Sequence, residues 1–226
     1  MSENTLFSYF TDEAEEVIRS RSSASWSKGE PALMDRYWNG RSALQEKGPG
    51  WNNLTRVCSA WGKDSLYFYF ECWFEELNVN AELGEGGPVD RLWEQDVAEV
   101  FLRPKGCDDY FEIEVSPLGQ WLDLHIIRPR IDVDFQWRSL LEVDIETDRR
   151  AKRWRAFLRL PFDSFLRASS LVSPPLPGDA WRLNLCRIAG REPNREYLSW
   201  RPTFTREPDF HVPSSFGNLI FLRETD

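Results

Sequence analysis

Apolar and polar side chains alternate along several short segments of the chain, a pattern typical of β-strands with one buried face. Segments 54–61 and 65–74 show this alternation on either side of the turn residues 62–64. Two alternating runs joined by a short polar turn predict a β-hairpin. The polar, glycine-rich stretch that follows, residues 75–90, is interpreted as a long loop.

A second group of alternating segments begins after this loop. Turns rich in Pro and Gly separate its first three members, so they predict a meander of neighbouring antiparallel strands. The meander covers 97–103, 110–116 and 120–127, and further strands are predicted at 153–160, 181–188, 195–200 and 218–223.

Little of the remaining sequence has helical character. Short helices are predicted within 12–20 and 161–169, and the proline-rich connection 173–179 is interpreted as a loop. Many short strands with frequent turns predict an all-β fold: an antiparallel β-sandwich, jelly-roll or immunoglobulin-like, with one or two short helices. We expect one domain over residues 1–226, in which 1–53 is the least defined part.

The meander has a polar row on each strand opposite an apolar row. If all apolar rows face the core, one common face carries the polar residues Glu99, Glu112, Glu114, Asp123 and His125. One interpretation is a solvated sheet face. The other is a ligand-binding face, because ionised carboxylates accept strong hydrogen bonds from the hydroxyls of a polyol.

Composition narrows the classes of ligand. Eleven Trp and fifteen Phe exceed what a core alone usually needs, and exposed rings are common platforms for sugars. A net charge of −9 disfavours nucleic acid and anionic membranes, and no apolar run reaches the length of a membrane span. Residues 1–16 lack the features of a secretory signal, so we expect a cytoplasmic chain unless its start has been trimmed.

The four cysteines are widely spaced and form no C-x-x-C pair. Reduced thiols are therefore favoured over disulfides, and a zinc site is disfavoured because only two His could join them. The residues concerned are Cys58, Cys72, Cys107 and Cys186, with His125 and His211.

Segment 92–104, LWEQDVAEVFLRP, resembles the family 9 carbohydrate-binding modules, whose members carry a W-E-x-D-x-x-E-[IV]-F-[IL] stretch. Segments 110–123, 181–190, 197–204 and 210–221 are similar to later parts of the same family, in the same order. The resemblance spans most of residues 54–222. It implies a β-sandwich of the DOMON-like group that binds a sugar or another small polar ligand without catalysis.

The resemblance also implies a site. In sugar-binding members two rings clamp a sugar; the first corresponds to Trp93, and the second, a Trp in those members, to Phe210. The family's hydroxyl-binding Glu corresponds to Glu99, whereas an Arg of sugar binders is replaced by Glu114, which puts the sugar's identity in doubt. The candidate ligand-binding residues are Trp93, Phe210, Glu99, Glu114, Asp96 and His211, with no catalytic residue.

Two of these residues have a simpler interpretation. Asp96 is favoured as a brace for the loop after Trp93, and His211 as a partner of a backbone carbonyl. Arg187 shares a strand face with Leu183 and Leu185, so a buried Arg there requires a carboxylate partner. Trp181 and Trp200 are interpreted as core residues.

Alternatives to sugar binding stay open at this stage. A haem-binding DOMON-type domain would need Met and His ligands, and the internal candidates are Met34, His125 and His211. A glycoside hydrolase would use a carboxyl pair from the acidic face. No cofactor is expected, although a structural Ca²⁺ ion in an acidic loop is possible by analogy with the family. A metabolite or a partner protein could also replace the sugar, and the oligomeric state is left open.

Overall fold

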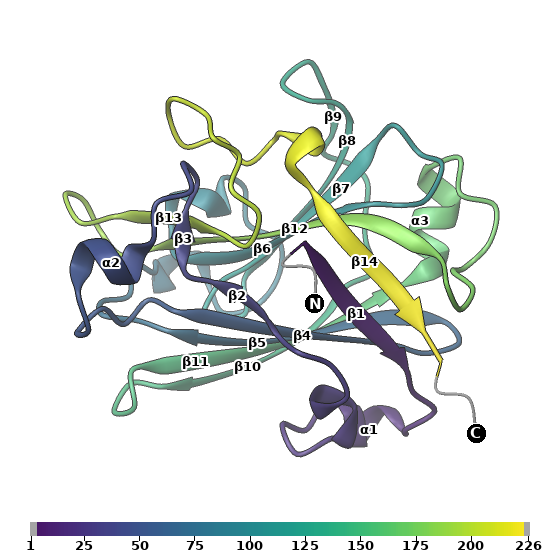
Figure 1. Ribbon diagram of the computed structural model, residues 1–226, viewed down its shortest axis with the longest axis horizontal. Helices are drawn as coiled ribbons and strands as arrows, with labels where there is room; N and C mark the ends of the chain where they lie inside the picture. The colour runs from purple at the N-terminus through teal and green to yellow at the C-terminus, as the bar shows by residue number, and fades with distance from the viewer. Residues whose placement is uncertain (1–3, 224–226) are drawn as a thin grey trace.

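The computed structural model describes residues 4–223, and strands make up most of its regular secondary structure (Figure 1). The alternation seen in the sequence becomes one inward and one outward row of side chains on each long strand. The strands are β1 (Thr5–Phe10), β2 (Ala32–Met34), β3 (Arg36–Tyr37), β4 (Thr55–Trp61), β5 (Ser65–Trp73), β6 (Val97–Arg103), β7 (Tyr110–Val115), β8 (Trp121–Arg128), β9 (Asp132–Asp134), β10 (Glu142–Asp148), β11 (Arg153–Pro161), β12 (Ala180–Ala189), β13 (Glu196–Ser199) and β14 (Gly217–Leu222).

Short helices cover the ends and one face of the sheet. The two expected helices are present, and a third, α2, was not predicted. Its start carries the pattern Ser-x-x-Gln of a capping box, and the Ser42 hydroxyl accepts a hydrogen bond from the Gln45 N–H at 3.3 Å. The α-helices are α1 (Glu15–Ile18), α2 (Ala43–Lys47) and α3 (Phe162–Ala168), and the 3₁₀ turns are η1 (Ala24–Ser27), η2 (Ala81–Leu83), η3 (Leu92–Glu94) and η4 (Pro213–Ser215).

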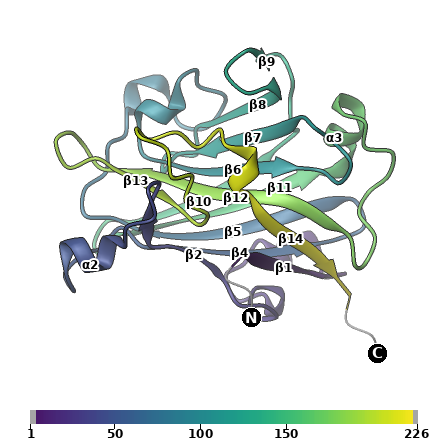
Figure 2. The same ribbon diagram turned by 45° about the horizontal axis from the view of Figure 1, so that its top comes forward.

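The strands form one continuous hydrogen-bonded sheet that folds into two layers. Its order is β10-β11-β5-β4-β1-β14-β12-β6-β7-β8-β9, and the edges β10 and β9 do not pair with each other. One layer runs from β10 to β4 and the other from β14 to β9 (Figures 1 and 2). This arrangement confirms the predicted β-sandwich.

Strand β1 joins the two layers. It pairs in parallel with β14 on one side and with β4 on the other, so the sheet is mixed rather than purely antiparallel. β14 can approach closely because its first residue is Gly217: a Cβ there would lie 2.8 Å from the Asn4 carbonyl oxygen. With β2 paired to β4 and β3 to β13, the segment before residue 54 is part of the sheet.

Three apolar clusters lie on different sides of the layers. The largest fills the space between them and includes Trp181 and Trp200, as expected from the sequence. A second covers the outer face of the β4–β5–β11 layer, where Trp26 and Ile18 pack on Tyr69. The third lies on the outer face of the β12–β6–β7–β8 layer, beneath the closing segment 210–216. Both faces of that layer are therefore apolar in part.

The long predicted strands and their predicted connections are confirmed. β4 and β5 form the expected hairpin, and β6, β7 and β8 form the expected meander. Five strands were not predicted from the sequence: β1, β2, β3, β9 and β10. All four cysteines are free thiols; Cys58 is half-buried and the other three are buried.

Candidate functional site

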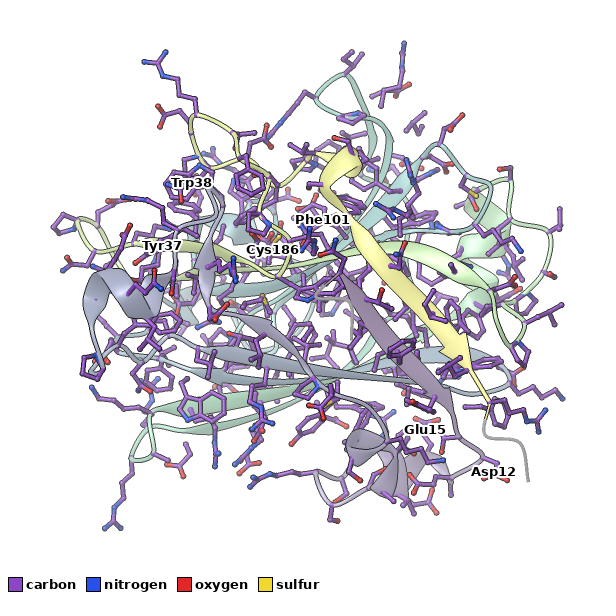
Figure 3. The ribbon with its side chains drawn as sticks, in the orientation of Figure 1. Asp12, Glu15, Tyr37, Trp38, Phe101 and Cys186 are labelled. Carbon is purple, nitrogen blue, oxygen red and sulfur yellow. The ribbon has the colours of Figure 1, made fainter. Side chains whose placement is uncertain are left out.

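A cavity of about 600 Å³ lies on the outer face of the β6–β7–β8 layer, away from the main core. Strands β6, β7, β8 and β12 supply its floor, and the loop before β9 and the segment before η4 supply its walls. Phe101 of β6 and Cys186 of β12, labelled in Figure 3, lie on this face. The lining residues are Trp93, Glu99, Phe101, Glu112, Leu124, Ile126, Arg130, Ile131, Val133, Phe135, Ile188, Tyr197, Pro208, Asp209, Phe210 and His211.

Strand register brings three glutamates together at this floor. Glu99 of β6 is directly opposite Glu114 of β7, and Glu112 lies two residues along β7 on the same face. All three side chains are almost fully removed from solvent. Within the described part of the chain, Oε2 of Glu99, Oε2 of Glu112 and both carboxyl oxygens of Glu114 have no hydrogen-bond donor when the groups are ionised.

Burial therefore favours the protonated carboxyl groups. It raises the pKa of Glu112 to about 7, and it raises the pKa of Glu99 and Glu114 well above the ordinary value. The negative charge of Glu112 acts in the same direction on both neighbours. A hydrogen bond between Glu112 and Glu114 lowers the pKa of the first and raises that of the second, so Glu114 holds its proton more firmly.

His211 forms a polar wall of the cavity. Its Nδ1 lies 2.8 Å from the Tyr110 hydroxyl, and its Nε2 lies 3.6 Å from Oε2 of Glu112. The partner is therefore a phenol and not the backbone carbonyl that we expected. Burial, with the nearby Arg130, lowers the pKa of His211 to about 4, so the ring is neutral at pH 7.

Aromatic rings form the other walls. Trp93, which is 36% exposed, lies on the η3 turn just before β6, and Tyr197 comes from β13. Phe210 packs edge-on against Phe101, with ring centroids 6.3 Å apart. At the mouth, Arg130 forms a salt bridge with Asp209, and Ile131 and Phe135 project with little cover.

Two of the five polar residues assigned to this face belong on the other side. Asp123 is paired with Ile113, and His125 with Phe111, so both project toward the main core. The apolar row of β8 (Leu122, Leu124 and Ile126) faces the cavity instead. The expectation failed because both faces of the layer are covered, and an apolar row on an outer strand then does not identify the core side.

Asp123 and His125 both have hydrogen-bond partners within the protein. Asp123 accepts hydrogen bonds from the backbone N–H and the hydroxyl of Ser139. The His125 ring stacks on Phe111 and its Nε2 contacts the Asp109 carboxylate.

The structure gathers four of the six candidate ligand-binding residues in the cavity: Trp93, Glu99, Phe210 and His211. Glu114 lies beside the cavity floor but does not line it. Asp96 is fully buried, forms a salt bridge to Arg187 at 3.3 Å and accepts a hydrogen bond from the Gly190 N–H at 2.7 Å. The preferred interpretation of Asp96 as a brace fits these contacts, and Arg187 has the carboxylate partner that its strand position required.

Several cavity residues were not singled out from the sequence. Glu112 was predicted on the correct face of the sheet but was not among the candidate ligand-binding residues. Tyr197, Arg130 and Asp209 belong to no motif that would have indicated a site. The position of Phe101, two residues after Glu99 on the same strand face, was the one available signal.

Two of the three candidate haem ligands, Met34 and His211, lie on opposite faces of the β12–β6–β7–β8 layer, and Nε2 of the third, His125, contacts the Asp109 carboxylate. Met34 is buried in the main core, whereas His211 lies in the cavity on the outer face of the β6–β7–β8 layer. In residues 4–223 no cluster of three or more His, Cys, Asp or Glu is arranged to hold a metal ion. None of the helices in this range is both long and apolar enough to cross a membrane.

Comparison with known proteins assigns the family. The sequence profile of carbohydrate-binding family 9 matches residues 59–221, which is most of the chain. The chain belongs to carbohydrate-binding family 9. In this family 9 protein, the stretch from Trp93 to Leu102 forms the η3 turn and strand β6, the elements that place Trp93 and Glu99 in the cavity.

Solved structures share the fold of this family 9 chain. A candidate carbohydrate-binding protein from Bacteroides uniformis has a TM-score of 0.71 at 18% identity, covering 96% of this chain and 99% of that protein. A family 9 carbohydrate-binding module from Caldicellulosiruptor kristjanssonii in complex with glucose has a TM-score of 0.65 at 12% identity, covering 98% and 97%. The same kind of module in complex with cellotriose has a TM-score of 0.63 at 13% identity, covering 98% and 95%.

Curated relatives include mammalian proteins. The UPF0462 protein C4orf33 of Homo sapiens is 28% identical over 148 residues, covering 62% of this chain and 67% of the human protein. Its homolog in Rattus norvegicus is 30% identical over 152 residues, covering 62% and 69%. The names of these relatives state no ligand.

Proposed function

We propose that this protein is a non-catalytic carbohydrate-binding protein and that its ligand occupies the cavity between Trp93 and Phe210. The observation that carries this proposal is the combination, in one cavity, of aromatic rings with buried carboxyl groups that lack partners. A pyranose ring offers both complementary surfaces, because its C–H faces pack on aromatic rings and its hydroxyls hydrogen-bond to carboxyl groups.

The family supports the same assignment. Family 9 members are non-catalytic carbohydrate-binding modules. The Caldicellulosiruptor modules, which have this fold, were solved with glucose and with cellotriose, so a gluco-configured sugar is the first ligand to test. Phe210 in place of a second Trp leaves less ring area for stacking, and Glu114 in place of an Arg removes a donor.

The state of the carboxyl groups argues against glycoside hydrolysis. That reaction pairs an acid whose pKa is raised with a second carboxylate that stays ionised. Here Glu99, Glu112 and Glu114 all have a raised pKa, and Glu112, with a pKa of about 7, is only partly ionised at neutral pH, so none of the three is a fully ionised partner. The cluster suits hydrogen bonding to a ligand better than attack on one.

Titration of sugars into wild-type protein and a Trp93→Ala variant tests the proposal. We expect saturable binding of at least one of glucose, cellobiose and cellotriose by calorimetry, and a loss of at least about tenfold in affinity in the variant. Trp73→Ala is the matched control, because Trp73 lies on β5 outside the cavity and its loss should leave the affinity unchanged.

Two results would contradict the proposal. An unchanged affinity in Trp93→Ala would place the ligand elsewhere. Release of a chromogenic leaving group from aryl glycosides, abolished by Glu99→Gln or Glu112→Gln, would make the protein a hydrolase.

A further inference from the structure

The floor of the cavity carries three buried carboxyl groups, and no protein cation within residues 4–223 contacts them directly. Among the described residues, no Lys or Arg forms a salt bridge with Glu99, Glu112 or Glu114. The ring of His211 lies within salt-bridge distance of Glu112, but this ring is neutral at pH 7. The two guanidinium groups nearest this floor have other partners.

Arg130 pairs with Asp209 at the mouth of the cavity. Arg195 donates to the backbone carbonyl oxygens of Trp93, at 2.6 Å, and of Gln95, at 3.2 Å. Both cations are thus held at the rim by other groups and act on the floor only at a distance, where Arg130 lowers the pKa of Glu112 and Arg195 that of Glu99. A cation in direct contact with these carboxyl groups has to come from outside the chain.

The unpartnered oxygen atoms show where that charge would be placed. Oε2 of Glu99 and Oε2 of Glu112 belong to residues that line the cavity, and both side chains are more than nine-tenths buried. An ammonium group brings three N–H donors and a unit charge, whereas a hydroxyl brings one donor and no charge. Hydrogen bonds between ionised partners are roughly twice as strong as neutral ones.

The walls favour the same group. Trp93, Tyr197 and Phe210 line the cavity, and the electron-rich face of an aromatic ring attracts a cation. The remaining apolar lining, which includes Ile126 and Leu124, leaves few other sites for a charge. A ligand with a polar ring and one protonated amine would satisfy both the walls and the floor.

We propose that the cavity selects an amino sugar, with its protonated amine held between the carboxyl groups of Glu99 and Glu112. This inference rests on the proposed function, because it specifies the class of sugar that the cavity takes.

Proton linkage gives the inference a second readout. With Glu112 near pKa 7, binding of an ammonium group expels protons from the cluster, so amino-sugar affinity should rise from pH 5.5 to 7 while neutral-sugar affinity does not. The groups that face Glu112 and enter this titration are Glu99 from β6, Tyr110 and Glu114 from β7, Cys186 from β12, and Arg130, Asp209 and His211 from the loops.

Calorimetry with matched pairs of sugars tests the proposal. The pairs are glucosamine, galactosamine and mannosamine against their neutral parents, 6-amino-6-deoxyglucose against glucose, and N-acetylglucosamine as the analogue without a charge. We expect at least one amino sugar to bind at least about tenfold more tightly than its neutral parent at pH 7. Glu112→Gln should reduce that ratio by about fivefold or more, and the exposed Glu146→Gln should leave it unchanged.

The possible failures are distinct. If neutral sugars bind as tightly as every amino sugar, the amine inference is overturned and the carbohydrate proposal stands. If no sugar of either kind binds, both are overturned. A thermal melt of Glu112→Gln verifies that the variant is folded, and Glu99→Gln provides an independent second variant.

Discussion

At the scale of single residues, burial of three acids makes stability depend on pH in an unusual direction. Glu112 has a pKa of about 7 in the folded protein against 4.5 when exposed. The folded state therefore keeps a proton that the unfolded state has released above pH 4.5. The stability from this group is complete below about pH 4.5 and is lost as the pH rises to about 7.

We expect the wild-type protein to lose on the order of 3 kcal/mol of unfolding free energy relative to Glu112→Gln between pH 5 and pH 8. Urea denaturation of both proteins at four pH values measures this difference. The exposed Glu146→Gln should follow the wild type. Parallel curves for wild type and Glu112→Gln would show that Glu112 is ionised at its buried position.

Strand parity determined some residue positions correctly and others wrongly. It placed Arg187 on the core face of β12, and the need of a buried guanidinium for a carboxylate was met by Asp96. It misplaced Asp123 and His125, because the rule assumes that apolar rows face the core. On β8 the apolar row lies on the cavity side of the sheet, and only the pairing register with β7 shows which row faces the cavity.

At the scale of elements, the loop from β8 to β9 and the residue that follows β9 form one rim of the cavity. Ile131 and Phe135, 75% and 51% exposed, line the cavity without contributing to an apolar cluster. Their apolar surface would be removed from water only when a ligand covers it.

We therefore expect the double variant Ile131→Ser/Phe135→Ser to bind sugar about tenfold more weakly, while its unfolding free energy changes by less than about 1 kcal/mol. Calorimetric titration and urea denaturation measure the two quantities. Leu176→Ser is the control, since the exposure of Leu176, 65%, lies between those of Ile131 and Phe135, but Leu176 lies on the connection before β12. An affinity equal to that of the wild type would show that the ligand does not reach this rim.

The elements that could be predicted are those with a long alternation and one consistently apolar row, such as β5 and β12. The missed strands are short, like β2 and β9, or charged. β10 carries Glu142, Asp144 and Glu146 opposite Val143 and Ile145, and these acids pair with arginines of β11 and with Arg19. A charged row of this kind is typical of an edge strand, and it weakens the apolar alternation by which a strand is predicted from sequence.

At the scale of the whole molecule, β1 is the hydrogen-bonded link between the two layers of the described chain. Its Leu6 is buried in the main core, and Ser8 accepts a hydrogen bond from Ser59 of β4 at 2.9 Å. The sequence did not predict this strand, because aromatic and polar residues mix without a clear apolar row, and a parallel link between layers depends on long-range pairing.

We expect Leu6→Ala to lower the unfolding free energy by about 2–5 kcal/mol, because the substitution leaves a cavity where the layers meet. Phe7→Ala, on the more exposed face of the same strand, is the control and should cost clearly less. Denaturant titration of both variants measures the difference. Equal losses would mean that β1 contributes only backbone pairing.

At Glu114 the proposed binding role of the acidic floor is in conflict with thermostability. Its carboxyl group lies between Glu99 and Leu122 in the sheet register, fully buried and without a donor. An apolar residue of similar size would relieve that penalty, since buried charges and polar groups are often replaced by apolar ones with a gain in stability. Directed evolution for heat resistance alone would therefore favour sequences in which the acidic floor is gone, and thermostable homologues without it should be poor guides to the ligand.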